Sequence, residues 1–496
     1  MVVIVRSRDI HRSLDPYSLS PSTVQTVACE GHLSRTSLER VIVTLRITVI
    51  GTGYLGATHA ACMAELGFYV LGVDIDERKI EQLAAGQLPF HEPGLQELLT
   101  KHTASGKLRF TTSFEEAGAW GDVHFIGVGT PQKPGGYGAD IRYVDAAALS
   151  LAQHITKDAL IVGKSTVPVG TARRLACLVQ EKHTGPGTIR FAWNPEFLRE
   201  GFAVKDTISP DRLVIGIEDG DLDAEAILRE VYASQLAAET PIIVTDYETA
   251  ELVKVAANAF LATKISFINA FSEVTEFVGG DIRTLADAIG HDARIGRRFL
   301  NAGVGFGGGC LPKDIRALQA RVSELGLDRT MRFLTEVDEI NLRRRDRVVA
   351  LTEEILGRLN GATVGILGVA FKPDSDDVRD SPALDVAARL FNAGADVNVY
   401  DPQGNANAAK RFPRLNYVDS VPAAVRDAHV VILLTEWQEF KNLHPEDLNG
   451  LVANKIIIDG RNVLNVQEWE DADWTIAALG RKFEPSREAI GLNAPV

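Results

Sequence analysis

Short apolar runs recur along two stretches of the chain, and each run is followed by a loop or a segment of helical composition. In the first stretch, the β-rich runs are 45–50, 69–73, 123–128 and 160–163. In the last third, they are 362–367, 397–400, 429–434 and 455–459. Alternating strands and helices are typical of parallel sheets covered by helices. The pattern predicts the α/β fold class, with two Rossmann-like, doubly wound parallel-sheet domains.

The region between these stretches is expected to be helical throughout. The segment 248–278 has no proline and is predicted to form one long helix, and further helices are expected at 282–289, 312–325 and 332–358. Within the long helix, Lys254 and Asn258 stand four residues apart among apolar neighbours, so their side chains share one face. Such a lysine either snorkels to solvent or has a partner and a task, and both interpretations stay open. A central all-helical domain is expected to join the two sheets.

A chain of 496 residues is long enough for two to four domains. The boundaries expected are 44–240 for the first α/β domain, 241–345 for the helical domain, 346–480 for the second α/β domain and 481–496 for a C-terminal tail. Residues 1–43 are rich in Ser, Arg and Thr and lack the continuous apolar segment of a signal peptide. They are either a dispensable extension or the result of a translation start assigned too far upstream.

Composition narrows the class of protein without changing this picture. The chain is 45% hydrophobic and 24% charged, which is ordinary for a globular protein. Its net charge of −14 argues against a nucleic-acid partner but leaves room for a local basic pocket that binds one phosphorylated ligand. No apolar run reaches the roughly 18–20 residues of a membrane span. We expect no nucleic-acid partner and no membrane association.

The cysteines indicate a reducing compartment and no metal site. There are four, Cys29, Cys62, Cys177 and Cys310, and their spacing matches neither a disulfide framework nor a set of metal ligands. Proteins with few, scattered cysteines are typical of reducing compartments. The prediction is a cytoplasmic protein without a bound metal.

A dinucleotide-binding motif follows the first predicted strand. The sequence Gly-Thr-Gly-Tyr-Leu-Gly at 51–56 has the form G-x-G-x-x-G and lies between a strand and an apolar helix. Asp74 ends the second strand, 18 residues beyond Gly56. Such glycines let a pyrophosphate approach the helix N-terminus, and the acid binds the ribose hydroxyls. An Asp at this position favours NAD over NADP, and Lys79 is either near the adenosine or solvated.

Two further loops follow strands of the same predicted sheet. They carry Thr130 and Thr166, which either contact a ligand in the crevice at the strand ends or serve as turn and cap residues. Farther along, Asn194-Pro195 is predicted to begin a helix, which would place Glu196 and Glu200 one turn apart on one face. Acids in a first helical turn are also common because of the helix dipole.

The glycine-rich stretch 303–309 runs directly into Cys310 and then Pro312. Glycine allows a ligand to approach the main chain, and proline suits the first turn of a helix. Cys310 would then lie at a helix N-terminus, where the partial positive charge favours a thiolate. Cys310 is therefore a candidate nucleophile, and the alternative is a buried cysteine in a flexible loop.

Basic residues are placed to bind an anionic ligand. Arg294, Arg297 and Arg298 precede the glycine-rich stretch. Lys372, Arg379 and Arg461 lie in loops after strands of the last third, where solvated loop charges are the alternative interpretation. This third lacks a full G-x-G-x-x-G, so a second dinucleotide is not expected there.

Taken in order, these motifs resemble those of the nucleotide-sugar 6-dehydrogenases, the UDP-glucose/GDP-mannose dehydrogenase family. The resemblance covers residues 45–480. It rests on six segments: Gly-Thr-Gly-Tyr-Leu-Gly, Lys-Ser-Thr-Val-Pro, Asn-Pro-Glu-Phe-Leu-Arg-Glu, Glu-Leu-Val-Lys-Val-Ala-Ala-Asn-Ala-Phe, Phe-Gly-Gly-Gly-Cys-Leu-Pro-Lys-Asp and Asp-Gly-Arg. It implies an N-terminal NAD domain, a helical dimer core and a C-terminal UDP-binding domain. It also implies a homodimer or a larger homo-oligomer.

The activity implied by the resemblance is the oxidation of UDP-glucose to UDP-glucuronate with two NAD⁺, through a thiohemiacetal and a thioester on the cysteine. Residues that match catalytic positions of the family are Cys310, Lys254, Asp314, Asn258, Glu196 and Thr166. Those expected to contact the cofactor are Gly51, Gly53, Tyr54, Leu55, Gly56, Asp74, Lys79, Thr130, Glu200 and Lys313. Those expected around the sugar nucleotide are Glu196, Phe197, Leu198, Lys254, Asn258, Arg294, Phe299, Asn301, Gly305, Phe306, Gly307, Lys372 and Arg461. The resemblance has Arg294 reach across the dimer interface, and the position of Asn301 varies in the family.

Two alternatives accompany this interpretation. The same chemistry on GDP-mannose or on a UDP-N-acetylhexosamine changes only the substrate. A non-catalytic protein that binds NAD or a nucleotide sugar is the alternative of another class.

Overall fold

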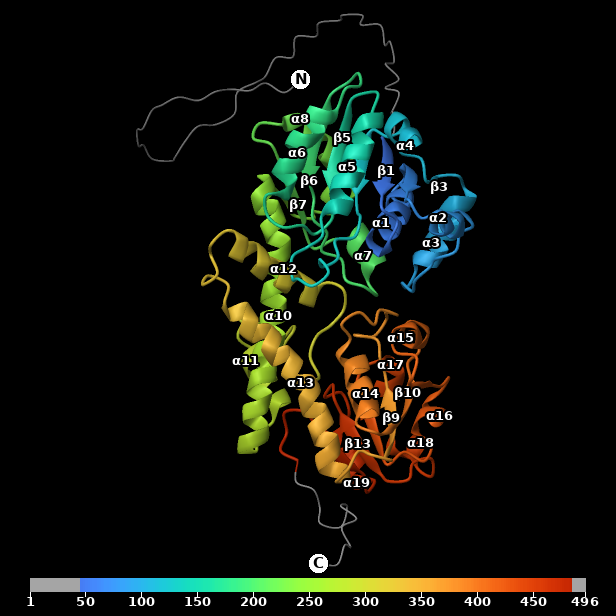
Figure 1. The fold of residues 1–496 in the computed structure, drawn as a ribbon, viewed down its shortest axis with the longest axis vertical. Helices are drawn as coiled ribbons and strands as arrows, with labels where there is room; N and C mark the ends of the chain where they lie inside the picture. The colour runs from blue at the N-terminus through green and yellow to red at the C-terminus, as the bar shows by residue number, and fades with distance from the viewer. Residues whose placement is uncertain (1–44, 484–496) are drawn as a thin grey trace, which may run out of the picture. The chain divides into compact units, whose positions relative to one another are not determined.

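The computed structural model describes residues 45–483, so the expectation for residues 1–43 lies outside the described part of the chain. An eight-stranded sheet forms the first domain, in the order β3-β2-β1-β4-β5-β6-β7-β8, with every neighbouring pair parallel except β6 and β7 (Figure 1). The strands are β1 (Arg46–Ile50), β2 (Tyr69–Val73), β3 (Leu108–Thr111), β4 (Val123–Ile126), β5 (Ala159–Gly163), β6 (Ile189–Trp193), β7 (Leu213–Ile217) and β8 (Ile242–Thr245).

Both faces of this sheet are buried. Phe125 of β4 points into one apolar cluster, and its neighbour Ile126 points into another on the opposite face. Burial on two faces explains why these strands appear as continuous apolar runs instead of alternating ones. The covering helices are α1 (Tyr54–Glu65), α2 (Glu77–Ala84), α3 (Leu95–Ala104), α4 (Phe114–Trp120), α5 (Arg142–His154), α6 (Thr171–Lys182), α7 (Ala203–Ile208), α8 (Leu222–Val231) and α9 (Ala233–Ala237).

Four helices follow, as the sequence predicted. They are α10 (Tyr247–Val278), α11 (Ile282–Gly290), α12 (Leu311–Glu324) and α13 (Phe333–Leu356). The long helix α10 packs against both α12 and α13 (Figure 1). Its buried face carries polar side chains as well as apolar ones, among them Lys254 and Asn258, while Phe260, Phe267 and Phe271 are exposed on other sides. Among the described residues, no helix is long and apolar enough to cross a membrane.

The second sheet has the order β11-β10-β9-β12-β13-β14, and all its neighbouring strands are parallel. Its strands are β9 (Thr363–Leu367), β10 (Asp396–Tyr400), β11 (Asn416–Tyr417), β12 (Val430–Leu433), β13 (Ile456–Asp459) and β14 (Thr475–Ala478). Its helices are α14 (Pro382–Asn392), α15 (Asn405–Arg411), α16 (Val421–Val425), α17 (Gln438–Lys441), α18 (Pro445–Leu448) and α19 (Val466–Asp471). The predicted fold class, two doubly wound parallel sheets joined by helices, is confirmed.

In each sheet the strand order reverses beside the first strand, between β1 and β4 and between β9 and β12. Ligands of open α/β sheets bind at such switch points, outside the carboxyl ends of the strands. The two switch points therefore define where ligand-binding residues are to be sought.

Candidate active site

Cys310 is the N-cap residue of α12, so the helix begins at Leu311 and Pro312 is its second residue. The thiol keeps an exposed face. Desolvation by the surrounding protein nevertheless raises its pKa to about 12, and the nearby carboxylates of Asp314 and Glu196 act in the same direction. These effects outweigh Lys254 and the helix end. Burial and the carboxylates therefore oppose the thiolate that the helix N-terminus was expected to favour.

Lys254 and Glu196 form a nearly buried ion pair close to this thiol. The Lys254 Nζ atom lies 2.8 Å from Glu196 Oε1. Burial lowers the pKa of Lys254, but its interactions with Glu196 first, and then with Cys310 and Asp314, outweigh burial and raise it overall. Lys254 is therefore a fixed cation in the site. Lys254 is therefore a buried lysine with a charged partner and does not snorkel to solvent. The sequence had left both interpretations open.

Asp314 receives hydrogen bonds from two of the predicted residues. Asn258 Nδ2 donates to its Oδ2 at 2.7 Å, and Lys313 Nζ to its Oδ1 at 2.5 Å. The backbone N–H of Asp314 donates to the carbonyl of Cys310, one turn earlier in α12. The structure thus brings Cys310, Lys254, Asn258, Glu196 and Asp314 together from a loop, α10 and α12.

Residues 194–200 are not helical, contrary to the prediction. The chain leaves β6 in an extended loop, and the next helix, α7, begins only at Ala203. Asn194 is no helix cap, because its buried amide donates to the carbonyl of Val214 at 2.7 Å. Glu196 and Glu200 consequently do not share a helical face. Glu196 lies beside Lys254, while Glu200 lies near the second α/β domain.

Glu200 joins the loop after β6 to the loop after β9. Its carboxylate accepts from Ser375 Oγ at 3.1 Å and lies 3.3 Å from Arg379 NH2, while Lys372 Nζ donates to its backbone carbonyl. Burial, followed by the charge of Asp377, raises the pKa of Glu200 to about 7. Burial also lowers the pKa of Lys372. Two predicted ligand contacts, Glu200 and Lys372, thus touch each other.

The first switch point carries the dinucleotide motif. Gly51 has φ of +90°, and a Cβ there would lie 2.7 Å from Val128, so the turn requires glycine. Asp74 accepts from Thr52 N at 2.9 Å and pairs with Lys79 Nζ at 2.8 Å. These contacts hold the carboxylate at the end of β2, where a ribose is bound in this fold. The residues therefore fit NAD, with Asp74 for the ribose and the N-terminus of α1 for the pyrophosphate.

Glu92 links this motif to the loop after β6, and sequence reasoning missed it. Its carboxylate accepts from the hydroxyl of Tyr54 and from the N–H groups of Gly201 and Ala203, at 2.6 and 2.7 Å. No local pattern around Glu92 indicated this role, because all its partners are distant in sequence.

Thr130 and Thr166 lie next to each other. The hydroxyl of Thr130 donates to the backbone carbonyl of Thr166 at 2.8 Å, so Thr130 supports the loop that carries Thr166. Thr166 lines a cavity of about 20 Å³ together with Lys313 and Asp314. Of the two threonines, Thr166 therefore lines the cavity that Asp314 also lines.

Lys164, two residues before Thr166, is a second buried cation that sequence reasoning left without a role. Its Nζ donates to Asn194 Oδ1 at 2.9 Å, and burial lowers its pKa to about 8. Lys164 and Glu196 line the same cavity of about 50 Å³. The motif Lys-Ser-Thr-Val-Pro contained the signal, since its lysine follows directly on a buried strand.

The glycine-rich loop is packed against protein on both sides. A Cβ on Gly305 would lie 2.4 Å from Asn341 Oδ1, and one on Gly307 would lie 2.3 Å from the carbonyl of Asp380. The guanidinium of Arg461 donates to the carbonyls of Leu434, Gly305 and Phe371. In the described structure the glycines therefore allow close packing of the loop between α13 and the second α/β domain.

The other residues predicted for the sugar nucleotide are distributed along this loop and the segments around it. Phe197 lies under the ammonium of Lys254, with 5.8 Å between Nζ and the ring centroid, and Leu198 N donates to Glu196 Oε2. Phe306 is buried. Phe299 has φ of +67°, and Asn301 accepts from Arg297. Arg294 is exposed and pairs with Asp292, away from the cluster around Cys310.

The second α/β domain has an acidic residue at the position that Asp74 holds in the first. Asp401 follows β10 as Asp74 follows β2, and each carboxylate accepts from the backbone N–H two residues after the first strand of its sheet, Val369 and Thr52. Asp401 Oδ2 also accepts from the N–H of Ala370 and from the indole of Trp437. That no second dinucleotide binds here stays a prediction from the incomplete glycine motif.

These features are typical of an NAD-dependent dehydrogenase: a dinucleotide site, together with a thiol, a lysine, an asparagine and two carboxylates. Comparison with known proteins agrees. The chain belongs to the UDP-glucose/GDP-mannose dehydrogenase family: its NAD binding domain matches residues 45–236, its central domain 248–343 and its UDP binding domain 365–466. The predicted family and the NAD cofactor are confirmed.

Relatives of known activity match nearly the whole chain. UDP-glucose 6-dehydrogenase TuaD of Bacillus subtilis is 41% identical over 437 residues, which are 88% of this chain and 93% of that protein. UDP-glucose 6-dehydrogenase of Rhizobium meliloti is 39% identical, over 88% of this chain and all of that protein. Among solved structures, a UDP-glucose dehydrogenase from Pyrobaculum islandicum is 38% identical with a TM-score of 0.81, covering 91% of this chain and 100% of that one.

A second solved structure bears on substrate choice. UDP-D-ManNAc dehydrogenase from Pyrococcus horikoshii has a TM-score of 0.76 and 27% identity, over 89% of this chain and 100% of that one. The fold is thus shared with an enzyme for an N-acetylated sugar, although the sequence is less similar.

Proposed function

We propose that this protein oxidises the C6 alcohol of UDP-glucose to the carboxylate of UDP-glucuronate in two successive oxidations on one site. The observation that carries the proposal is the group of polar side chains around Cys310, with the dinucleotide motif in the same structure. An alcohol dehydrogenase that stopped at the aldehyde would have no use for a thiol beside an ammonium and two carboxylates. The 41% and 39% identity to UDP-glucose 6-dehydrogenases supports the choice of sugar.

When bound, NAD⁺ accepts a hydride in each of the two oxidations. After the first, the sugar carries an aldehyde. The thiol of Cys310 adds to its carbonyl carbon, an S–C bond forms, and the thiol proton ends on the former carbonyl oxygen, which gives a thiohemiacetal. The second oxidation removes the C–H hydride and the hydroxyl proton, which leaves a thioester. Water then cleaves the S–C bond, releases the acid and restores the thiol.

The charged neighbours of Cys310 have separate roles in this sequence. Lys254, a fixed cation, and the amide of Asn258 would donate to the oxygen that becomes negative while the S–C bond forms or breaks. Asp314, which orients Asn258 and Lys313, would exchange protons with the substrate hydroxyl. Glu196 would accept a proton from the water that attacks the thioester. Thr166, beside Asp314, would position that water or the sugar.

The raised pKa of Cys310 adds a condition to this mechanism. Because burial raises the pKa of the thiol, loss of its proton while the S–C bond forms is favoured over loss before substrate binds. The proximity of the Lys254 cation supports this coupled step, since it lowers the cost of negative charge on sulphur.

The sugar nucleotide would lie between the loop after β6 and the loops of the second α/β domain. Phe197, Leu198, Phe299, Asn301, Gly305, Phe306 and Gly307 would enclose the sugar, and Lys372 would bind the nucleotide. The guanidinium of Arg461 donates to three backbone carbonyls, so its contact with a nucleotide would require an exchange of partners. The contact between Glu200 and Lys372 supports a site formed jointly by both α/β domains.

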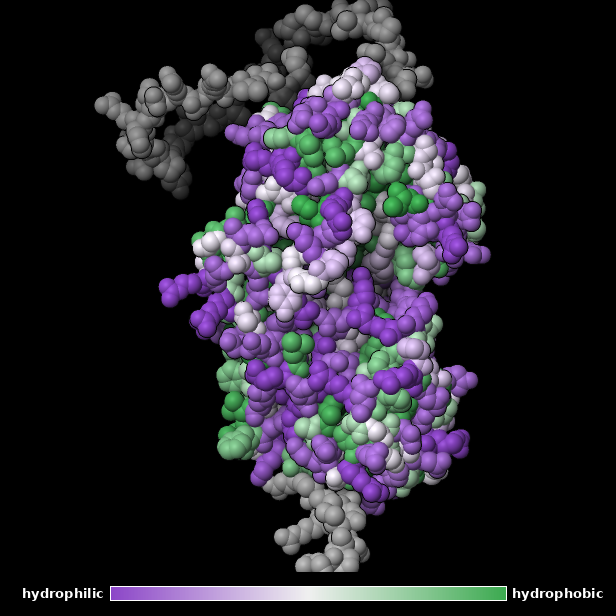
Figure 2. Space-filling model, viewed as in Figure 1, coloured by the Kyte–Doolittle hydropathy of each residue, from purple (hydrophilic) through white to green (hydrophobic). Residues whose placement is uncertain are grey.

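The exposed apolar side of α10 supports a homo-oligomer. Phe260, Phe267, Phe271, Val274 and Phe277 are 40–88% exposed and lie three, four or seven residues apart, so they share one side of the helix. In Figure 2, hydrophobic surface gathers where the C-terminal half of α10 lies in Figure 1. A second copy packed on this side would bury it, and Arg294, which is exposed, would be free to reach a neighbouring subunit. We further propose a cytoplasmic location.

The stoichiometry of NADH is the test of this function. Two NADH per UDP-glucose support the four-electron oxidation, while one per sugar would indicate ordinary alcohol oxidation. Parallel assays with GDP-mannose and UDP-N-acetylhexosamines decide the substrate. Nucleotide-sugar binding without any NADH release would favour the non-catalytic alternative.

A further inference from the structure

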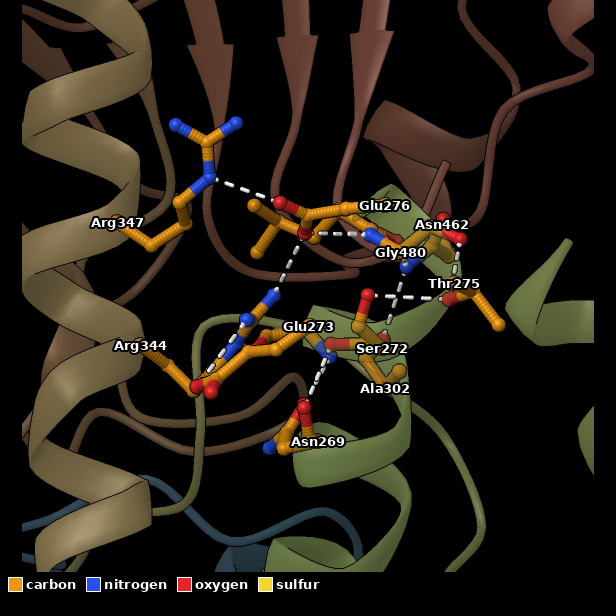
Figure 3. A network of polar contacts seen from close by, with 12 residues as sticks. Asn269, Ser272, Glu273, Thr275, Glu276, Ala302, Arg344, Arg347, Asn462 and Gly480 are labelled. Carbon is orange, nitrogen blue, oxygen red and sulfur yellow. Dashed lines mark hydrogen bonds and ion pairs between the residues drawn. The ribbon is translucent and has the colours of Figure 1, made fainter. Parts of the chain in front are cut away.

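The glycine-rich loop begins, at Gly303, beside a buried network of polar side chains. Figure 3 shows α10 contributing Asn269, Glu273 and Glu276, and α13 contributing Arg344 and Arg347. The fully buried Arg344 lies 3.3 Å from Glu276, and Arg347 lies 2.8 Å from the other oxygen of that carboxylate. Glu273 and Glu276 of α10 thus pair with Arg344 and Arg347 of α13 and fix the two helices to each other.

The same network reaches the second α/β domain. Glu276 Oε1 accepts from the backbone N–H of Gly480 at 2.8 Å, and Thr275 Oγ1 donates to the carbonyl of Gly480 at 2.9 Å (Figure 3). Asn462 Nδ2 donates to the carbonyl of Ala302, the residue before the loop, at 3.1 Å. The network is therefore a rigid frame at the point where the loop begins.

The loop is held to this frame through its backbone. At Gly303, the N–H donates to Asn269 Oδ1 at 2.9 Å and the carbonyl accepts from Arg344 Nε at 3.3 Å. Farther along, Val304 N donates to the carbonyl of Gly460 and Gly308 N to that of Arg379. The backbone of the loop thus forms hydrogen bonds with side chains and backbone outside the loop, as a strand does with its neighbours in a sheet.

Asn341 makes the most complete of these contacts. Its Oδ1 accepts from the N–H of Phe306 at 2.7 Å, and its Nδ2 donates to the carbonyl of the same residue at 2.9 Å. Its side chain is fully buried in the face of α13 that also carries Arg344 and Arg345. The oxygen and the nitrogen of one carboxamide therefore both bond the backbone of Phe306, four positions before Cys310.

Gly305 shows how closely Asn341 approaches the loop. The residue has φ of +104°, and a Cβ built on it would lie 2.4 Å from Asn341 Oδ1. The glycine is therefore needed for the contact with Asn341 as well as for its own backbone conformation. Asn341 and the glycine form one unit in which neither can be replaced without moving the other.

We propose that Asn341 is a positioning residue of this enzyme. It acts through the backbone of Phe306 and sets the path of the loop that ends in Cys310 and encloses the sugar. The proposal rests on the proposed function for its kinetic consequence, but its structural consequence, the placement of the Cys310 thiol, is measurable without any substrate.

The test replaces the carboxamide donor while keeping the shape. Asn341→Asp retains an acceptor for Phe306 N but places a carboxylate oxygen against the Phe306 carbonyl, leaving a buried acceptor unpaired. We expect kcat/KM for UDP-glucose to fall about tenfold or more, mainly through KM, while KM for NAD⁺ changes less than about twofold. A purely structural defect would lower the active fraction and leave both KM values unchanged.

A second measurement follows the thiol in the free enzyme. The rate at which iodoacetamide alkylates Cys310, read by peptide mass spectrometry, is expected to rise about threefold or more in Asn341→Asp. The exposed Cys177 on α6 is the internal reference and should keep its rate. Asn392→Asp, the same substitution on an exposed asparagine of α14, should behave as the parent enzyme.

The outcomes are separable. An unchanged Cys310 rate and unchanged KM for the sugar in folded Asn341→Asp would overturn the positioning role. If Asn341→Asp does not fold, Asn341→Ser, which removes both bonds without adding charge, carries the same expectations and the same refutation. If the parent enzyme releases no NADH with any nucleotide sugar, the proposed function fails, and the alkylation rates still decide the role of Asn341.

Discussion

Lys254 Nζ and Glu196 Oε1 lie 2.8 Å apart, and both side chains are almost wholly enclosed. Breaking a buried pair by removing one partner leaves an uncompensated charge. The pair therefore links catalysis to stability. Glu196 would serve the water that cleaves the thioester, and it also neutralises the cation beside Cys310.

The first prediction follows from this pair. Glu196→Gln should lower the free energy of unfolding by about 3 kcal/mol, because the Lys254 ammonium loses its nearest counter-charge. Urea denaturation measures the loss. Glu225→Gln, which removes a more exposed pair with Arg229, is the control and should cost less than about 1 kcal/mol. Equal losses in the two variants would show that the buried pair contributes no more to stability than the exposed pair.

Cys310→Ser tests the covalent mechanism. A hydroxyl is a much poorer nucleophile than a thiol and gives no thioester, so NAD-linked formation of the acid should be abolished. Binding of the nucleotide sugar, measured by calorimetry, should stay within about threefold of the parent, since the substitution exchanges one small polar atom. Full activity in this variant would refute the thioester. Cys177→Ser, on the exposed side of α6, should leave activity unchanged.

The third prediction concerns pH and a buried acid outside the catalytic cluster. Glu251, one turn before Lys254 on α10, accepts from Gly170 N and Ala172 N, both at 2.7 Å, at the start of α6. Burial raises its pKa from 4.5 to about 7. The folded protein therefore holds a proton between pH 4.5 and 7 that the unfolded chain has lost, so this group's stabilising contribution declines as pH rises through that window.

Glu251→Gln removes this dependence. The free energy of unfolding of the parent, relative to that of the variant, should be higher at pH 5 than at pH 8 by about 3 kcal/mol. The thermal midpoint of the parent, relative to that of the variant, should accordingly be higher at pH 5. Scanning calorimetry across this range measures it. A difference that is constant or grows toward pH 8 would contradict the assignment.

The fourth prediction concerns the exposed side of α10. Phe267→Glu combined with Phe271→Glu places charge on this exposed apolar side and should convert an oligomer into monomers, as measured by light scattering. Leu222→Glu on α8 introduces the same charge at an exposed apolar position elsewhere and should leave the mass unchanged. Unaltered assembly in the double variant would move the interface to another surface.

Much of the fold was predictable because its signals are local. The apolar runs predicted eight of the fourteen described strands to within a few residues, while β3, β6, β7, β8, β11 and β14 were not predicted. The absence of proline predicted α10 nearly to its ends. The prediction of a helix beginning at Asn194-Pro195 was wrong because the side chain of the expected cap residue makes tertiary hydrogen bonds instead. Asn194 Nδ2 donates to the carbonyl of Val214, and Asn194 Oδ1 accepts from Lys164 Nζ. A cap signal predicts a helix only when the side chain is not needed elsewhere.

The site was predictable in its members more than in its electrostatics. Lys254 and Asn258 stood out as polar residues on an apolar helix face, and the same reasoning applied to α13 would have found Asn341. The raised pKa of Cys310 could not be predicted from its position in the sequence alone. A helix end favours a thiolate, but the burial and the carboxylates that oppose it come from α12 and from the loop after β6. Glu92 and Glu251 have only distant partners and carried no sequence signal.

The presence of the G-x-G-x-x-G turn in one sheet and not in the other has a consequence for the order of events in the proposed reaction. Of the two described sheets, the first carries this turn, at Gly51–Gly56, so both oxidations would use the one cofactor site at β1 and β4. In the proposed reaction, spent NADH must depart and fresh NAD⁺ must arrive while the half-oxidised sugar waits. The bond to Cys310 is then a tether as much as a chemical activation: it retains a reactive aldehyde throughout an exchange that opens the site to solvent.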